Sequence, residues 1–220
     1  MKLNPKKPQS NRQAFALKEL CFTVVGIVVI GVLILPLLAR AKDKSPRINC
    51  CNDLKQVALA FRIWSGDNGD RYPMAALTNQ NGGPLYANTE TMFRYFQVMS
   101  NELVIPKVIF CPDDGERNPA TNFGPGFSSK NISYFVNLNA DEANPNMFLI
   151  GDRTLSGGRL MTNGTMVLSS NQNVFWLPKK MHDRNGNIAR TDGSVAQLSN
   201  SRLADALAHT GEIETYLLFP

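Results

Sequence analysis

The chain has little net charge beyond its first nineteen residues, and this scarcity excludes one broad class of function. Of the formal net charge of +5, residues 1–19 carry +4 and the other 201 residues carry +1. A nucleic-acid-binding domain needs a basic face on its folded part, where basic side chains alternate with base-reading or stacking groups. The sequence therefore predicts no nucleic-acid partner.

Common catalytic motifs are also missing. The sequence contains no H-E-x-x-H metal motif, no nucleophile elbow and no glycine-rich phosphate loop. His182 with Asp183 and Asp192 is the set best suited to acid–base chemistry, with the histidine as base and a carboxylate orienting it. Because no nucleophile accompanies them, we expect these residues to tie strands together or to cap a turn. The chain is predicted not to be an enzyme.

Four cysteines leave few choices for disulfides or for zinc. Cys21 lies in an apolar stretch, and the remaining three, Cys50, Cys51 and Cys111, allow at most one pair. In an oxidising compartment a bond from Cys50 or Cys51 to Cys111 would close a loop of about sixty residues. Zinc is less favoured, because these cysteines have no histidine at ligand spacing to complete a tetrahedral site.

Two acidic clusters, 67–70 and 113–116, offer the oxygen ligands that calcium takes. Neither cluster has the spacing of an EF-hand loop, and Asp, Asn and Gly at these positions suit turns equally well. No cofactor is predicted, and calcium is retained as the alternative. Trp64, Tyr72, Tyr134 and Trp176 are scattered aromatic residues, which we expect in the core rather than on a sugar-stacking surface.

A long apolar stretch dominates the first part of the chain. Residues 20–39 are twenty uncharged residues, enough as a helix to cross a hydrocarbon core of roughly 30 Å. The basic residues precede this stretch, as the positive-inside rule expects of a cytoplasmic segment. The sequence thus predicts a single-pass membrane protein with its N-terminus inside and its folded part outside the cytoplasm.

Two ordinary interpretations of this segment are weaker. A secretory signal peptide could be cleaved near Ala39-Arg40-Ala41, but the apolar stretch is too long and the arginine does not suit the cleavage motif. A plain signal anchor fits the length but leaves Glu19 unexplained, because a carboxylate beside an apolar membrane segment is costly unless it is paired.

Residues 15–20 read FALKEL and are followed by the apolar stretch with Pro36. This pattern resembles the start of the type IV prepilin and type II secretion pseudopilin family. The resemblance implies a leader over 1–14, cleavage between Ala14 and Phe15 by prepilin peptidase, and methylation of Phe15. It also implies an assembly helix over 15–42, in which Glu19 meets the terminal ammonium of a neighbouring subunit.

Two departures from the family pattern occur in this segment: Ala14 stands for the usual glycine, and Lys18 stands for an apolar residue. Alanine is small enough for the peptidase pocket, so we still expect cleavage. Lys18 could pair locally with Glu19. Pro36 removes one backbone hydrogen bond and is expected to kink or loosen the assembly helix.

The far end of the chain carries a second likeness. His182 is followed after nine residues by Asp192-Gly193, which resembles the H-x9-DG signature of one group of prepilin-like proteins. Cys50, Cys111-Pro112, Ser133-Tyr134 and Gly151-Asp152 resemble the same group. The resemblance favours a Cys50–Cys111 disulfide and a structural role for His182, Asp192 and Gly193.

Hydrophobic periodicity and turn signals predict an α+β, pilin-like fold. A helix from Phe15 to about Trp64 is expected, with an interruption at Ser45-Pro46 and an end at 66–70. Its second half would pack on a mainly antiparallel sheet in an exported domain over 43–220. Shorter helices are predicted at 91–99 and 202–209, strands at 108–111, 132–137, 147–150, 166–169 and 174–177, a turn at 111–115, and hairpin turns at 163–164 and 185–186.

These observations predict a pseudopilin-like or minor-pilin-like subunit of the inner membrane, whose partners are prepilin peptidase and other pilin or pseudopilin subunits. A second hypothesis is a membrane-tethered module that binds carbohydrate or protein and uses the prepilin route without polymerising. A third is an exported hydrolase that uses His182 and Asp192.

Overall fold

The structure is a computed structural model that describes residues 17–76 and 86–220, without the side chains of 17–18 and 36–45. The predicted leader 1–14 and the processing residues Ala14 and Phe15 therefore lie outside the described residues. The chain divides into two units, Met1–Lys44 and Ser45–Pro220. The second unit is α+β with antiparallel strands, which confirms the coarse fold class predicted from the sequence.

The helix α1 (Leu17–Asp67) is the first element, and it continues through Ser45-Pro46. The predicted interruption there is wrong. A proline inside a helix costs roughly 3 kcal/mol because it lacks a donor and crowds the preceding turn. Beyond Pro46 the helix buries Leu54, Val57 and Phe61 completely, and packing of such a face supplies most of the stability of a helix in a protein.

The end of α1 falls inside the range predicted for it. After Asp67 the backbone turns left-handed at Gly69 (φ 71°) and Asp70 (φ 57°). The N–H groups of Asn68 and Asp70 both donate to the carbonyl of Ser65, at 3.0 and 2.9 Å. Glycine adopts this conformation without steric cost, so the Gly-Asp sequence stops the helix.

In the first unit, the described side chains of α1 over 20–35 are almost all exposed, although most are apolar. Among the described residues, no helix combines the length and apolar character required to cross a membrane. The predicted spanning segment 15–42 starts before the described residues, and its side chains from Pro36 onward are outside the description.

Short helices follow α1 in the second unit. They are α2 (Phe93–Val98), α3 (Ser100–Leu103) and the 3-10 turns η3 (Pro106–Ile109) and η4 (Ser129–Asn131). The helix predicted at 91–99 is confirmed, and the turn predicted at 111–115 closes through a bond from Asp114 N–H to the Cys111 carbonyl. The strand predicted at 108–111 is wrong, because Pro106 opens a 3-10 turn with its fixed φ.

The main sheet has seven strands in the order β4-β5-β9-β1-β2-β7-β8, and every pair is antiparallel. A separate two-stranded sheet pairs β3 with β6. Four of the five predicted strands overlap observed strands. The bounds are β1 (Tyr134–Asn137), β2 (Phe148–Asp152), β3 (Leu155–Ser156), β4 (Arg159–Leu160), β5 (Thr165–Ser169), β6 (Phe175–Trp176), β7 (Asn185–Arg190), β8 (Val195–Ser199) and β9 (Glu214–Leu218).

One of the two predicted hairpin turns is correct. Asn163-Gly164 connects β4 and β5, with Gly164 at φ 85°. Asn185-Gly186 is not a turn, because both residues belong to β7. A Cβ on Gly186 would lie 2.6 Å from the ring of Trp176, so this glycine is required by a close approach in the tertiary structure. The turn that follows β7 is formed by residues 191–194.

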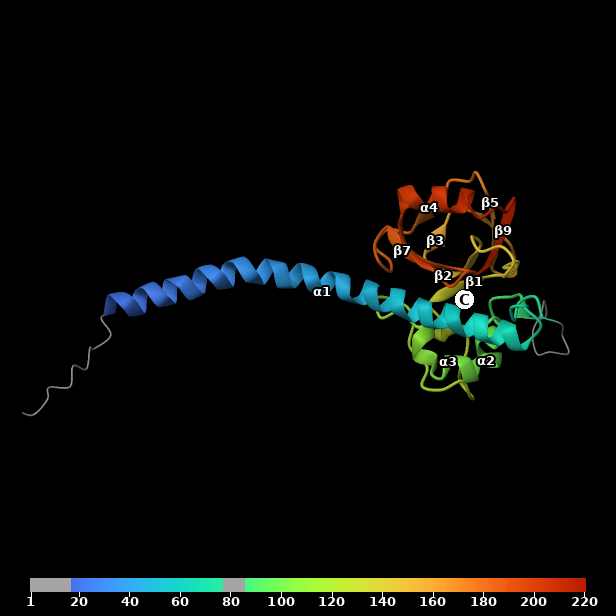
Figure 1. The fold of residues 1–220 in the computed structure, drawn as a ribbon, viewed down its shortest axis with the longest axis horizontal. Coiled ribbons are helices and arrows are strands. Elements are labelled where there is room, and N and C mark those ends of the chain that lie inside the picture. Colours follow the sequence, from blue (N-terminus) through green and yellow to red (C-terminus); the bar gives the residue numbers. More distant parts are fainter. Residues whose placement is uncertain (1–16, 77–85) are drawn as a thin grey trace, which may run out of the picture. The chain divides into compact units, whose positions relative to one another are not determined.

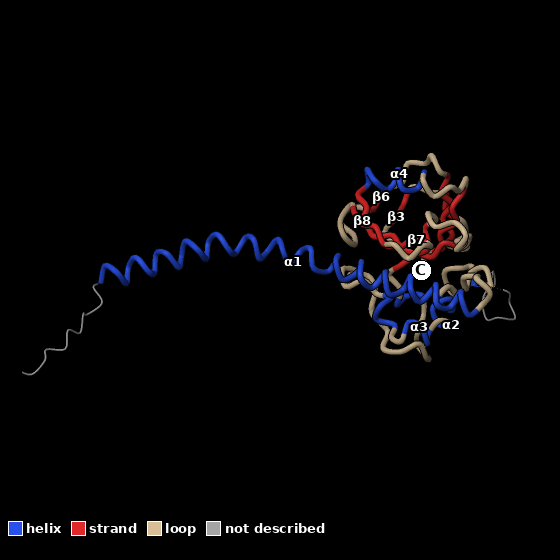
Figure 2. The backbone as a smooth tube through the Cα atoms, viewed as in Figure 1, coloured by secondary structure: helices blue, strands red, loops and turns tan. Residues whose placement is uncertain are grey.

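The inner strands of the main sheet are buried on both faces, and all four residues of β1 and all five of β2 are buried. Tyr134 and Val136 belong to the cluster with α1, α2 and η3, whereas Phe135 belongs to the cluster with β6 and α4 (Asn200–Ala208). Figures 1 and 2 show α4 and β3 on one side of the sheet and α2 and α3 on the other. The four scattered aromatic residues expected in the core, Trp64, Tyr72, Tyr134 and Trp176, are all buried.

Candidate functional site

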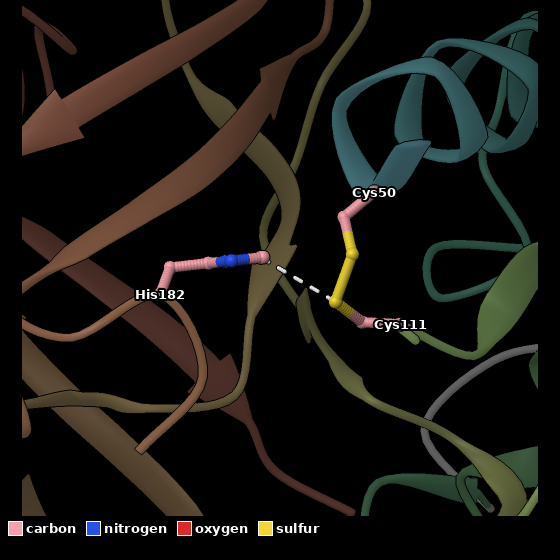
Figure 3. Close-up of side chains that lie close together, drawn as sticks. All are labelled: Cys50, Cys111 and His182. Atoms are coloured by element: carbon pink, nitrogen blue, oxygen red, sulfur yellow. Dashed lines mark hydrogen bonds between the residues drawn. A yellow bond between two sulfur atoms is a disulfide. The ribbon is translucent and has the colours of Figure 1, made fainter. Parts of the chain in front are cut away.

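A disulfide between two fully buried cysteines anchors the site (Figure 3). Cys50 lies on the second half of α1, and Cys111 follows η3, so the bond ties α1 to a loop 61 residues further along the chain. This is the pairing that the family resemblance implies. Cys51 is partly exposed and free.

His182 points at this disulfide from the other side of the site (Figure 3). Its Nε2 lies 3.4 Å from Cys111 Sγ, and its Nδ1 lies 3.1 Å from Asp113 Oδ2. The backbone N–H of His182 donates to the same Asp113 oxygen at 2.7 Å. The imidazole is 1% exposed, so the ring is held in place by neighbours rather than by water.

Asp152 at the end of β2 completes the cluster. Its side chain is fully buried, and Oδ2 accepts hydrogen bonds from Asn187 N–H at 2.7 Å and from Asn187 Nδ2 at 3.2 Å. Oδ2 lies 3.6 Å from His182 Nε2, too far for a hydrogen bond. Oδ1 has no hydrogen-bond partner among the described residues.

Burial sets the protonation of both groups. It raises the pKa of Asp152 to about 8, although the two bonds from Asn187 and the charge of Arg47 oppose the rise. It lowers the pKa of His182, against the attraction of Asp113. A neutral carboxylic acid beside a neutral imidazole is therefore the favoured state at neutral pH.

The backbone at His182 and the two residues after it has an unusual conformation. His182, Asp183 and Arg184 have φ values of 60°, 34° and 56°, a left-handed run that side-chain-bearing residues seldom adopt. Asp183 stabilises this turn, because its Oδ1 accepts from Lys179 N–H at 2.9 Å and its carbonyl accepts from Asn185 Nδ2 at 2.9 Å. Strain of this kind persists where the surroundings fix the geometry, and here it aims the imidazole at the disulfide.

Asp192 and Gly193 form a different site, the turn between β7 and β8. Gly193 has φ 85°, and Asp192 Oδ1 accepts from Ser194 N–H at 2.7 Å. The Asp192 carbonyl also accepts from Arg62 Nη1 at 3.1 Å, which links the turn to α1. Burial is the largest single cause and raises the pKa of Asp192, but the bonds from Ser194 and the charges of Arg190 and Arg62 together outweigh it, so the pKa is lowered. The H-x9-DG residues thus occupy two places, and the carboxylates beside His182 are those of Asp113 and Asp152.

Two carboxylates of the acidic cluster 113–116 form ion pairs with basic side chains. Asp114 makes a bidentate ion pair with Arg153, with two N···O distances of 2.7 Å. Glu116 pairs with the same Arg153 at 2.7 Å and with Lys180. These carboxylates link the loop after Cys111 to Arg153, the residue after β2, and to Lys180, two residues before His182.

The two residues expected to act in assembly, Glu19 and Pro36, lie on the first half of α1. Glu19 is exposed in the first turn of α1. Pro36 lies within α1, and its side chain is not described.

No family model matches this chain, and no curated protein or solved structure matches it.

Sequence reasoning missed how Asp113, Asp152 and Arg47 take part in the buried cluster. Gly151-Asp152 and Cys111-Pro112 are among the likenesses to the prepilin-like group, and Cys111 and Asp152 do meet at His182. Nothing in the spacing along the chain indicates that meeting, because 70 residues separate Cys111 from His182. The sequence has no histidine at ligand spacing from the cysteines, but the fold places His182 beside Cys111.

Proposed function

We propose that the chain is a non-enzymatic pseudopilin-like or minor-pilin-like subunit of a type II secretion or type IV pilus-like system. It is made with the leader 1–14, cut between Ala14 and Phe15, methylated on Phe15, and held in the inner membrane by 15–42 with the domain 43–220 outside. The observation that carries this proposal is the sequence FALKEL, placed between a basic leader and twenty uncharged residues.

The apolar surface of α1 supports an assembly role. Phe22 is 78% exposed and Ile27 is 70% exposed, and large apolar side chains are exposed along the whole described stretch from Leu20 to Leu35. A helix that is apolar on all sides is stable only where lipid or other helices cover it. Both a bilayer and a filament core provide such cover.

Glu19 suits a role in joining subunits. It is the one acidic residue in the first turn of α1, and beyond it the sequence has no charge up to Arg40. A carboxylate in this position is far less costly when it is paired with a cation, such as the new terminal ammonium of a neighbouring subunit. The Cys50–Cys111 disulfide fits the exported location of the domain, because such bonds persist in oxidising compartments.

The processing step is tested by intact-mass and N-terminal peptide analysis of protein recovered from membranes of a host with active prepilin peptidase. We expect a chain that begins with methylated Phe15. Ala14→Gly, which restores the family pattern, should be cut at least as fast, whereas Ala14→Glu should retain the leader. A wild-type chain that begins at Lys42, or that keeps residues 1–14, would overturn the proposal.

The assembly step is tested separately with Glu19→Ala. This variant should enter the membrane and be cut normally but co-purify poorly with other filament subunits. Asp67→Ala, a change at an exposed carboxylate at the far end of α1, is the matched control and should co-purify like the wild type. Normal incorporation of the Glu19→Ala protein would contradict the role given to this carboxylate.

A second candidate is a tethered protein-binding module that does not polymerise. An apolar groove between α1 and the α3–η3 segment favours it. The side chains that line this groove and stay about half exposed or more are Leu59, Ile63, Val104 and Ile105. A protein of this kind would stay monomeric in the membrane, and crosslinking between copies of the chain distinguishes the two candidates.

A further inference from the structure

We propose that Cys50, Cys111, His182 and Asp152 bind a divalent metal ion of the zinc type when the disulfide is reduced. This inference concerns the second unit alone and does not rest on the proposed function. Three of the four ligand atoms, the two sulfur atoms and a nitrogen of His182, already lie within 4.8 Å of one another. Thiolate, imidazole and carboxylate are the groups that zinc takes as ligands.

Two of the six ligand-to-ligand distances, both from His182, match the edges of a tetrahedral site. Bond lengths of roughly 2.0 to 2.3 Å from zinc to N, O and S place neighbouring ligand atoms about 3.3 to 3.8 Å apart. His182 Nε2 lies 3.4 Å from Cys111 Sγ and 3.6 Å from Asp152 Oδ2. Once the disulfide is broken, the two sulfur atoms must separate to a non-bonded distance. The Asp152 carboxyl group must also move toward them, because it is not among the groups whose ligand atoms lie within 4.8 Å of one another.

The histidine is held in the form that binds a metal through Nε2. Asp113 Oδ2 lies 3.1 Å from Nδ1, which places the ring proton there and leaves the Nε2 lone pair facing Cys111 and Asp152. A carboxylate that accepts from the second ring nitrogen is the usual support of a zinc-bound histidine. The backbone bond from His182 N–H to the same oxygen, at 2.7 Å, fixes the position of Asp113.

Asp152 provides the fourth ligand. Its carboxyl group is fully buried, and its Oδ1 has no hydrogen-bond partner among the described residues. An unsatisfied buried oxygen is costly, and the other oxygen of the same carboxyl group, Oδ2, lies 3.6 Å from His182 Nε2, so this carboxyl group is the nearest further ligand. A bound metal would also allow the carboxyl group to ionise inside the protein.

The charges of such a site would balance. Two thiolates, one carboxylate and a divalent cation sum to one negative charge. Arg47 on α1 acts electrostatically on both Asp152 and His182, and its Nε is buried without a hydrogen-bond partner in the described part of the chain. The guanidinium would neutralise the loaded cluster, whereas in the oxidised protein this cation faces a neutral acid.

Formation of the site consumes a dithiol reductant. The dithiol transfers two electrons and two protons to the Cys50–Cys111 bond, becomes a disulfide itself, and leaves two thiols on the protein. The metal then replaces the thiol protons and the Asp152 proton, which pass to solvent. Oxidation of the thiols by a disulfide reverses the sequence and expels the metal.

The test titrates Co²⁺ into the full-length protein in detergent micelles, before and after reduction with a phosphine. We expect one Co²⁺ per reduced chain, with the ligand-field bands of tetrahedral cobalt and a thiolate-to-cobalt charge-transfer band that Zn²⁺ removes. The oxidised protein should show neither band. A reduced chain that gains no such bands, whether or not circular dichroism shows it folded, would overturn the proposal.

Variants separate this site from adventitious binding. Cys111→Ser should abolish the charge-transfer band, whereas Cys51→Ser, a change at the neighbouring free cysteine, should leave it intact. Asp113→Asn should weaken cobalt binding by about 10- to 100-fold and keep the tetrahedral spectrum, because it removes only the support of His182. If Cys51→Ser and Cys111→Ser lost the charge-transfer band equally, the cysteines would be binding cobalt without the proposed tetrahedral site. That result would contradict the inference.

Discussion

At the scale of single residues, the chemistry of this protein lies in two buried titratable groups that face each other without a hydrogen bond. His182 Nε2 and Asp152 Oδ2 are 3.6 Å apart, and each of the two side chains is at most 1% exposed. Burial lowers the pKa of the histidine and raises that of the carboxyl group to about 8. The pair therefore avoids charge at neutral pH, and its protonation is coupled to folding.

This coupling predicts a pH dependence of stability. The unfolded chain releases the Asp152 proton near pH 4, while the folded protein keeps it to about pH 8, so the free energy of unfolding falls as pH rises through this range. His182 opposes this fall only up to about pH 6.5, because its folded pKa is lowered. Between pH 6.5 and 8, we expect the wild type to lose up to about 1.4 kcal/mol per pH unit.

Urea unfolding followed by fluorescence of the buried Trp64 and Trp176 measures this slope. Asp152→Asn should remove it. Asp192→Asn is the matched control, because the pKa of Asp192 is lowered and its titration lies below this window. A slope that persists unchanged in Asp152→Asn would show that another group carries the pH dependence.

At the scale of elements, the contact between β6 and β7 joins the small sheet to the large one. Trp176 on β6 is fully buried, and its ring lies directly on the backbone of Gly186 on β7. The backbone N–H of Trp176 donates to Asn200 Oδ1 at the start of α4, at 2.8 Å. Trp176 thus joins β6 to β7 through its ring and to α4 through its backbone, and any atom added at Gly186 must displace the ring.

Gly186→Ala is therefore expected to destabilise the protein by roughly 1 to 3 kcal/mol through overpacking. Gly115→Ala is the control, because a Cβ there meets nothing within 4 Å and the change should stay within about 0.5 kcal/mol. Urea unfolding of both variants provides the comparison. Equal stability of the two variants would mean that Trp176 moves without cost.

At the scale of the whole molecule, both hydrophobic clusters formed by the described residues lie in the second unit. The first buried residue of these clusters is Cys50 and the last is Leu218. The first unit, in contrast, presents apolar side chains without covering them in the described stretch 20–35. The second unit covers its own apolar side chains, whereas the apolar side chains of the first unit require lipid or protein to cover them.

We predict that a chain starting at Ser45 folds by itself, remains soluble and unfolds cooperatively in urea. A chain starting at Ala58 lacks Cys50, Leu54 and Val57, all fully buried, and should fail to fold. Near-ultraviolet circular dichroism of the two proteins distinguishes the outcomes. A disordered chain from Ser45 would show that the domain needs part of the first unit.

Much of the fold could be predicted because it depends on residues close together in the sequence. The end of α1 at Gly69-Asp70, the helix at 91–99 and the turn at Asn163-Gly164 each follow from a few neighbouring residues, as does antiparallel pairing from short strands separated by turns. The strand predicted at 108–111 failed for a local reason, the 3-10 turn opened by Pro106. Two other predictions failed because distant contacts overruled local preferences. Pro46 did not end α1, because Leu54 and Phe61 pack on the domain, and Gly186 is required by Trp176 rather than by a turn.

The sequence by itself determined the separation into a basic start, an apolar stretch and a nearly neutral domain, because charge and hydropathy are properties of the residues. The sequence analysis also singled out the cysteines, the histidine and the segments that carry the acidic residues of the candidate site. Only the tertiary structure decided that Cys111, His182 and Asp152 meet and that Asp192 lies elsewhere. The physical reason is that these side chains come from a loop, a strained turn and a strand whose positions depend on packing across the whole sheet.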